Sequence, residues 1–257
     1  DTIVEDIMET NIISIDTQMD QEDIGNLFRK YDLLAMPVVD QENRLVGIIT
    51  IDDIIEIIEI ENTEDFQVMA AMEPSEEEYL KTNVMRLARN RIVWLLVLMI
   101  SATFTGNIIK HYEELLASVV VLASFIPMLM DSGGNAGSQS ATMVIRGLAL
   151  DEIKMRDLGK VVWKEFRVSL LVGVVLTSVN FLRVYLFEGT DIAIAATISL
   201  SLLFTIILAK IVGSTLPIVA KKLKLDPAIM AAPMITTIVD AVALLAYFRI
   251  ASWLLGI

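Results

Sequence analysis

Residues 92–109 read IVWLLVLMISATFTGNII, an apolar run without a charged residue and about as long as a helix must be to cross a membrane. Further apolar runs follow at 115–130, 166–187, 192–219 and 228–256. The second run continues into DSGGNAGSQSATMVI, which consists mostly of small, weakly polar residues. We therefore predict a mainly α-helical membrane protein in which residues 91–257 form a domain of five transmembrane helices.

Lysine and arginine gather in alternate connections between these runs, and the other connections hold Lys110 or only the acids Glu188 and Asp191. The basic residues are Arg86, Arg89 and Arg91 before the first run, Arg146, Lys154, Arg156, Lys160 and Lys164 between the second and third, and Lys221, Lys222 and Lys224 between the fourth and fifth. Because basic loops tend to stay in the cytosol, we predict a multi-pass protein of the cytoplasmic membrane. Its N-terminus would be cytosolic and its C-terminus outside.

Charge divides the chain into a small acidic part and a larger apolar part. The 257 residues are 55% hydrophobic yet carry a net charge of −13, and the first 80 residues hold 22 of the 33 acids but three of the 20 bases. An acidic exposed part would repel phosphates, which excludes nucleic acid as a partner. The chain has no cysteine, which excludes disulfides and thiol chemistry, and it has one histidine, which excludes multi-histidine metal sites. Because the chain starts at Asp1 without a basic and apolar leader, we expect a fragment that lacks a signal peptide.

The acidic part contains the pattern of a small α/β module at residues 1–60. Residues 36–53 read MPVVDQENRLVGIITIDD, which predicts strands at 37–39 and 45–49 around a polar turn. Thr50 and Asp53 have the spacing of a capping box at the start of a following helix. Upstream, apolar residues at helical spacing predict a helix over 20–31.

The helix that starts near Asp52 is unusually rich in acids. Seven acids fall within 14 residues, namely Asp52, Asp53, Glu56, Glu59, Glu61, Glu64 and Asp65. One interpretation is a solvated acidic face. The other is a sensor for a hard divalent cation such as Mg²⁺ or Ca²⁺, which carboxylates bind well. We assign residues 61–90 to an acidic connecting helix of plug type and a linker, so motion here would reach the first span.

Asp240 is the most informative residue of the apolar part. It lies about 12 residues into the run that starts at 228, and the run offers no basic residue before Arg249. A carboxylate inside a membrane is costly and marks a functional site by default. Thr236 and Thr237 stand one turn earlier, and Pro233 would free a backbone carbonyl. These groups suit a path for a hydrated cation; the alternative is a hydrogen-bonded structural aspartate.

The small-residue stretch is the second candidate. Asp131, Asn135 and Gln139 follow one another at one-turn intervals and place a carboxylate and amide oxygens on one helix face. We expect irregular polar backbone here, which would have to be buried or line water. Alternatively, Gly133 and Gly137 serve close helix packing.

The remaining polar residues of the apolar part have ordinary explanations. Lys210 lies near the cytosolic end of the fourth run, where we expect its side chain to extend to water. His111 is expected on the surface of an outside loop, and Trp94 and Trp253 fit the membrane interfaces.

The order of these parts resembles the MgtE family of magnesium channels over essentially the whole chain. The resemblance rests on VEDIM, PVVD and LVGIIT of a CBS module, the acidic helix, five spans, GGNAGSQS in the second span, and DPA with a later Pro and Asp in the fifth. Family members carry a helical domain and a CBS pair ahead of the pore. This sequence lacks the helical domain and the first CBS module, so its module corresponds to the second of the pair.

The resemblance also implies roles for individual residues. The family's pore aspartate corresponds to Asp240, and the Asn of its GGN motif corresponds to Asn135. The acids that bind regulatory Mg²⁺ correspond to Asp53, Glu56, Glu61, Glu64 and Asp65. Family members are homodimers with one pore on the two-fold axis, so two Asp240 carboxylates would face one ion.

We predict a homodimeric Mg²⁺ channel in membrane lipid, not an enzyme, that passes the hydrated ion and is gated by cytosolic Mg²⁺. The pore residues are Asp240, Asn135, Thr236, Asp131 and Gln139, and the regulatory ligands are Asp53, Glu56, Glu59, Glu61, Glu64 and Asp65. One alternative is a divalent-cation exchanger or exporter with a proton-linked Asp240. Another is a membrane receptor whose CBS module binds a nucleotide. The sequence shows neither a pair of acids nor a Ser/His arrangement that would favour a hydrolase.

Overall fold

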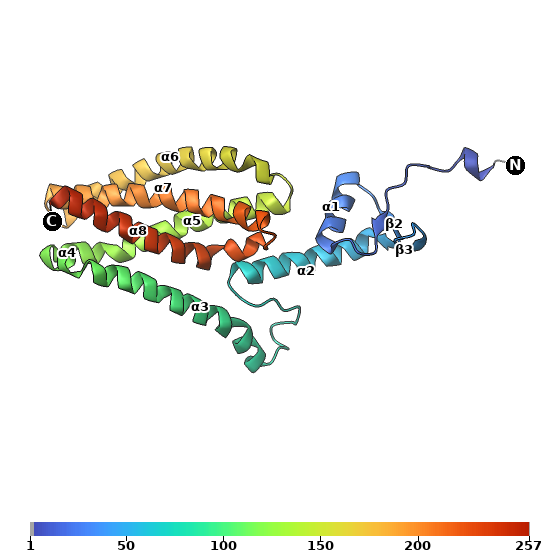
Figure 1. Ribbon diagram of the computed structural model, residues 1–257, viewed down its shortest axis with the longest axis horizontal. Coiled ribbons are helices and arrows are strands. Elements are labelled where there is room, and N and C mark those ends of the chain that lie inside the picture. Colours follow the sequence, from blue (N-terminus) through green and yellow to red (C-terminus); the bar gives the residue numbers. More distant parts are fainter. Residues whose placement is uncertain (1–2, 257) are drawn as a thin grey trace. The chain divides into compact units, whose positions relative to one another are not determined.

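The computed structural model of the chain describes residues 3–256. They divide into two compact units, with the boundary along the chain between Asp65 and Phe66. The smaller unit is a mixed α/β module and the larger unit is helical, as Figure 1 shows. The predicted fold class is confirmed: a mainly helical membrane protein in which a small α/β module precedes the helices along the chain.

The smaller unit is a three-stranded sheet with one helix between its first two strands and a second helix that begins after the third strand. The elements are a 3-10 turn η1 (Val4–Asp6), β1 (Ile15–Asp16), α1 (Gln21–Tyr31), β2 (Ala35–Val39), β3 (Leu45–Thr50) and the start of α2 (Ile51–Met69). The strand order is β1-β2-β3, with β1 parallel and β3 antiparallel to β2. The core consists of Ile15, Ile24, Phe28, Met36 and Ile54. The predicted strands and the predicted helix over 20–31 are confirmed to within two residues.

The larger unit is a bundle of long helices. Its elements are α3 (Val84–His111), α4 (Glu113–Ser118), η2 (Val120–Phe125), α5 (Ile126–Ala149), η3 (Met155–Asp157), α6 (Leu158–Phe187), α7 (Ile192–Lys222), η4 (Pro227–Met230) and α8 (Ala232–Leu255). The helices α5, α7 and α8 pack against one another, α6 covers α7, and α3 packs against α8 (Figure 1). The fully buried side chains that join them include Leu129, Ile206, Ile235, Leu244 and Tyr247.

Four helical segments of the described residues are long and apolar enough to cross a membrane, so the predicted number of five is not confirmed. They are Val84–His111, Met155–Phe187, Ile192–Lys222 and Ala232–Leu255. The predicted second run at 115–130 is divided between α4, η2 and the first residues of α5. The helix α5 has 24 residues and therefore a length of about 36 Å, but its small and polar residues lower its hydropathy.

The expectation of irregular backbone in the small-residue stretch was wrong, because α5 runs through it as a regular helix. The glycines instead bring helices together. A methyl group at Gly137 would lie 2.7 Å from Ile235 Cγ2 of α8, and one at Gly133 would lie 2.8 Å from Thr205 Cγ2 of α7. Close helix packing, the alternative interpretation of these glycines, therefore applies.

We expect Gly213→Ala to lower the melting temperature of the purified protein in detergent. A methyl group at Gly213 would overlap the backbone carbonyl of Gly137 across the α5–α7 contact, and overpacking of this kind costs about 1–3 kcal/mol. Gly159→Ala on α6 is the control, since its added methyl meets no atom within 4 Å and alanine is favoured in a helix. Equal melting temperatures of the two variants would contradict the close contact.

Candidate cation site

The helix α5 has two chemically different faces. Asp131, Asn135 and Gln139 are exposed at one-turn intervals, whereas Gly133 and Gly137 lie on the buried side. A row of polar side chains on a helix of membrane length needs water or a partner, because hydrocarbon satisfies none of their hydrogen bonds. The structure thus places the three predicted α5 residues on one polar, uncovered face.

Asp240 of α8 lies close to this face. Its side chain is partly buried, and its carboxylate is near enough to Asp131 of α5 for the two negative charges to repel. Thr236, one turn earlier on α8, lies against Gly134, since a methyl group there would come within 2.8 Å of Thr236 Cγ2. The seam between α5 and α8 therefore brings Asp131, Thr236 and Asp240 together.

Within residues 3–256, the side chain of Asp240 takes part in no hydrogen bond and no ion pair. Arg249, the nearest base on its own helix, instead donates from Nε to the hydroxyl of Tyr112 at 3.4 Å. The described residues thus provide no hydrogen-bond donor to Asp240, which argues against the alternative of a structural aspartate. A carboxylate left in this state favours a cation or water beside it.

Two threonines of α8, Thr236 and Thr237, use their hydroxyl hydrogens within the helix. The hydroxyls of Thr236 and Thr237 both donate to the carbonyl oxygen of Pro233 at 3.0 Å. Their own oxygens are then acceptors for the hydrogens of water. Pro233 does not loosen the backbone as expected, because it stands in the first turn of α8, where a missing N–H is harmless.

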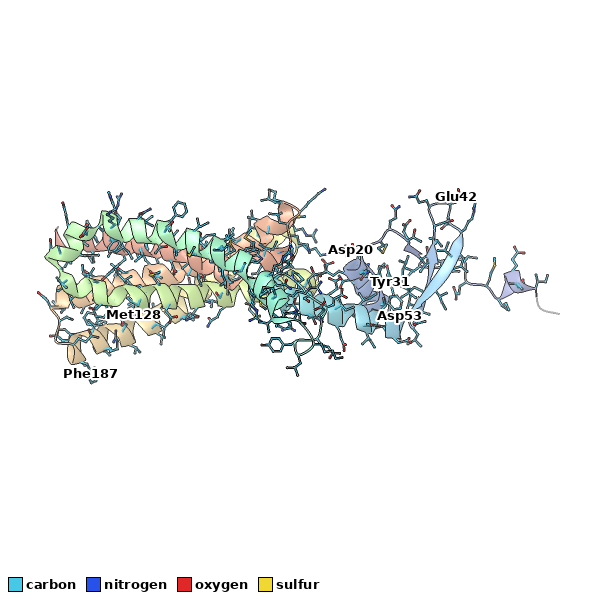
Figure 2. The ribbon with its side chains drawn as sticks, turned by 90° about the horizontal axis from the view of Figure 1, so that it is seen from below. Asp20, Tyr31, Glu42, Asp53, Met128 and Phe187 are labelled. Carbon is cyan, nitrogen blue, oxygen red and sulfur yellow. The ribbon has the colours of Figure 1, made fainter. Side chains whose placement is uncertain are left out.

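The acidic helix α2 begins with the predicted cap. The carboxylate of Asp53 accepts hydrogen bonds from the backbone N–H of Thr50 at 3.0 Å and from its hydroxyl at 2.6 Å, both at Oδ2. These hydrogen bonds lower the pKa of Asp53. Figure 2 labels Asp53 in α2 and Asp20 before α1. Asp53 is therefore ionised, with Oδ1 left for a further ligand.

The acids farther along α2 meet others that sequence reasoning missed. Burial raises the pKa of the Glu61 carboxyl above its usual value, and repulsion by nearby carboxylates adds to the rise. Those carboxylates are Glu64, Glu22, Asp20 and Asp65. The run of acids that opens α1 was the available signal for Asp20 and Glu22. In residues 3–256, no three acids or histidines converge closely enough to hold a metal ion, and Glu56 and Glu59 stay exposed.

The expectation for Lys210 was wrong. Only 4% of the residue is exposed, and its ammonium group lies in the bundle beside Ser140 and Glu165 rather than in water. The reason is that a carboxylate on α6 and a hydroxyl on α5 offer it partners inside the protein. A base and an acid at similar depth in adjacent spans would have been the signal.

Comparisons with known proteins agree with both units. Residues 126–250 match the family model MgtE, described as divalent cation transporter, and residues 4–60 match the CBS domain. Magnesium transporter MgtE of Bacillus subtilis is 38% identical over 249 residues, which cover 97% of this chain and 54% of that protein. Its counterparts in Thermus thermophilus and Enterococcus faecalis are 35% and 34% identical, over 99% and 98% of this chain and 56% and 55% of theirs. The chain thus spans about half the length of the curated relatives it matches.

Proposed function

Because this chain carries a CBS domain followed by a transporter domain of the MgtE family, we propose that it is the pore and part of the cytosolic sensor of a Mg²⁺ channel. The observation that supports this most strongly is the partly buried, unpaired Asp240 beside the uncovered polar face of α5. Similar proteins named as magnesium transporters support Mg²⁺ as the transported ion.

A homodimer would give these polar faces a use. We infer that α5 crosses the membrane as a fifth span and that two copies face each other about a two-fold axis, as most homodimers do. Asp131, Asn135 and Gln139 of both copies would then line one path, with two Asp240 carboxylates beside it. Rings of carboxylates are a common device of cation channels. With cytosolic basic loops, the N-terminus lies in the cytosol and the C-terminus outside.

The chemistry of these groups suits a hydrated ion. Mg²⁺ gives up its water reluctantly, so a pore passes it most easily by accepting hydrogen bonds from its bound waters. Asp240 provides an ionised acceptor, and Asn135 and Gln139 provide amide oxygens. The hydroxyl of Thr236 already donates to Pro233, so its oxygen is also an acceptor. Each of these side chains thus offers an oxygen that can accept a hydrogen bond from the water bound to the ion.

Gating would arise from the acids of α2 and the start of α1. Without Mg²⁺ they repel one another, and bound ions would relieve the repulsion and favour one conformation, which is a population shift. The linker after α2 offers a route to the first span. The side chain of Gln67 exchanges two hydrogen bonds with the backbone of Ser75, the N–H of Glu73 donates to the carbonyl of Asn90 at 2.8 Å, and Glu77 pairs with Arg86.

We expect a cysteine at Asn135 to be reached by a water-soluble thiol reagent and the reaction to block Mg²⁺ flux in liposomes. The chain contains no cysteine, so the label is specific. Leu171→Cys is the control: this α6 side chain is 73% exposed and would face lipid, where a charged reagent does not enter. Cross-linking of two copies through Asn135→Cys, but not through Leu171→Cys, would be expected for a dimer. Labelling without block would contradict the pore assignment.

Recordings from planar bilayers distinguish the channel from an exchanger. We expect unitary current steps carried by Mg²⁺, at rates that no carrier reaches. Flux that is obligatorily tied to counterflow of protons, without unitary steps, would instead assign Asp240 to a carrier site. A receptor that uses its spans only as an anchor would show neither.

A further inference from the structure

Three polar side chains from three helices meet inside the bundle and are not explained by the proposed pore or sensor. The hydroxyl of Ser140 on α5 donates to Oε2 of Glu165 on α6 at 2.6 Å, and Nζ of Lys210 on α7 donates to Ser140 Oγ at 3.2 Å. Lys210 Nζ lies 3.8 Å from the same oxygen of Glu165. We call these residues the Ser140 cluster. Ser140 is 2% and Lys210 4% exposed, and the Glu165 side chain is 17% exposed, so the cluster is largely shielded from solvent.

The charged groups of the cluster all have hydrogen-bond partners, but burying them costs desolvation free energy. The serine hydroxyl accepts from the ammonium group and donates to the carboxylate, so each charged group has a hydrogen-bond partner. Burying an ion pair costs desolvation, and an apolar replacement of the whole pair is often as stable or more so. Stability alone therefore does not account for charges at this place. A hydrogen-bonded ion pair differs from an apolar contact because it holds its groups in a preferred orientation.

The contacts that α5 makes at its glycines lack such direction. Along its buried face α5 meets α7 and α8 through glycine backbone, at Gly133, Gly137 and Gly213. At Gly133 and Gly137 the side chains of Thr205, Ile235 and Val239 pack against the helix by van der Waals contact, which is less directional than a hydrogen bond. Ser140 follows Gln139 directly, so it points about 100° around the helix from the polar face. The hydrogen bonds of Ser140 therefore act on the direction in which Gln139 and Asn135 point.

We propose that Glu165 and Lys210, acting through Ser140, are positioning residues that set the rotation of α5 and thereby the placement of the Asn135 and Gln139 oxygens toward the transported ion. This inference rests on the proposed function. Neither charged residue touches the ion. Their effect should therefore appear in the accessibility of the polar face and in discrimination between ions.

The test compares Lys210→Met, Glu165→Gln and the double variant, each also combined with Gln139→Cys. Either single change leaves one buried charge without its partner, so we expect a lower melting temperature and Mg²⁺ flux reduced about tenfold, as for a misplaced functional group. The double variant removes both charges and should regain the melting temperature. Its labelling rate at Gln139→Cys and its ratio of Mg²⁺ to Ca²⁺ flux should still differ from those of the parent.

Two further variants sharpen the result. Lys210→Arg keeps a positive charge and should preserve the flux ratio better than Lys210→Met. Lys160→Met is the control, because the ion pair of Lys160 with Asp157 at 2.8 Å is exposed at the lysine and worth little. A double variant with parental labelling rate and flux ratio would overturn the proposal and leave the cluster with a purely structural role. If Asn135→Cys modification also fails to block flux, the proposed function itself fails; if it blocks, the inference fails alone.

Discussion

Asp240→Asn should abolish Mg²⁺ flux in liposomes, to at least about a hundredfold below the parent, while the protein still inserts and folds. The amide has nearly the same size, so packing at the α5–α8 seam is preserved. It carries no charge, and the attraction between a carboxylate and a divalent cation is strong where water is scarce. In the proposed dimer the substitution removes two charges from one path.

The chain provides a closely matched control for this variant. Asp226, a short distance before α8, accepts a hydrogen bond from the N–H of Ala228 at 2.8 Å and caps the turn η4. Asparagine caps a helix about as well as aspartate, so Asp226→Asn makes the same chemical change without consequence. Its flux should equal that of the parent. Normal uptake through Asp240→Asn would remove this residue from the pore.

The effect on stability gives Asp240→Asn a second readout. Asp131 and Asp240 repel each other when no cation is present. Neutralising Asp240 removes that repulsion, so the variant should melt at the same or a higher temperature than the parent in the absence of Mg²⁺. It should also gain less from added Mg²⁺, since an ion stabilises the folded state only as far as it binds it. A loss of flux with a collapse of the melting temperature would instead indicate misfolding.

Local chemistry made much of this structure predictable. Apolar length predicted five spans, and four of them are found as long apolar helices, because a helix that faces lipid carries apolar side chains around its circumference. Spacing identified the caps at Asp53 and Asp226, because a cap is made by residues two or three positions apart. The strands of the small unit followed from apolar runs on both sides of a polar turn.

Contacts between distant segments were not predictable in the same way. The helix α5 escaped an apolar-length criterion because it packs with glycine and exposes amides, and its conformation depends on α7 and α8 for cover. Lys210 has a partner 45 positions earlier and another 70 positions earlier, so its sequence neighbours indicated only an ordinary snorkelling lysine. Asp20 and Glu22 join Glu61 through the fold of the small unit. For Asp240, the lack of nearby bases on its own helix made a cation or water a candidate partner but left a hydrogen-bonded structural aspartate open.

Neutralising the acids at the end of the sensor should weaken closure of the channel by cytosolic Mg²⁺. In the triple variant Glu61→Gln, Glu64→Gln, Asp65→Asn, we expect the Mg²⁺ concentration for half-closure to rise at least about tenfold, which corresponds to about 1.4 kcal/mol of lost coupling. Currents in bilayers at stepped cytosolic Mg²⁺ measure it. The control is Glu5→Gln, Asp6→Asn, Glu9→Gln, which removes the same charge from exposed positions of the same unit.

The direction of the pH effect follows from Glu61. Its pKa is raised by burial and by the surrounding carboxylates, so it takes up a proton at a higher pH than an ordinary glutamate. The ionised form therefore costs folding free energy, which is relieved either when the pH falls through the raised pKa or when a cation binds. Because a proton and Mg²⁺ compete for the same oxygens, mild acidification should raise the Mg²⁺ concentration needed for closure. The triple variant should lose this pH dependence. If it closes like the parent at every pH, the ions that control the pore bind elsewhere.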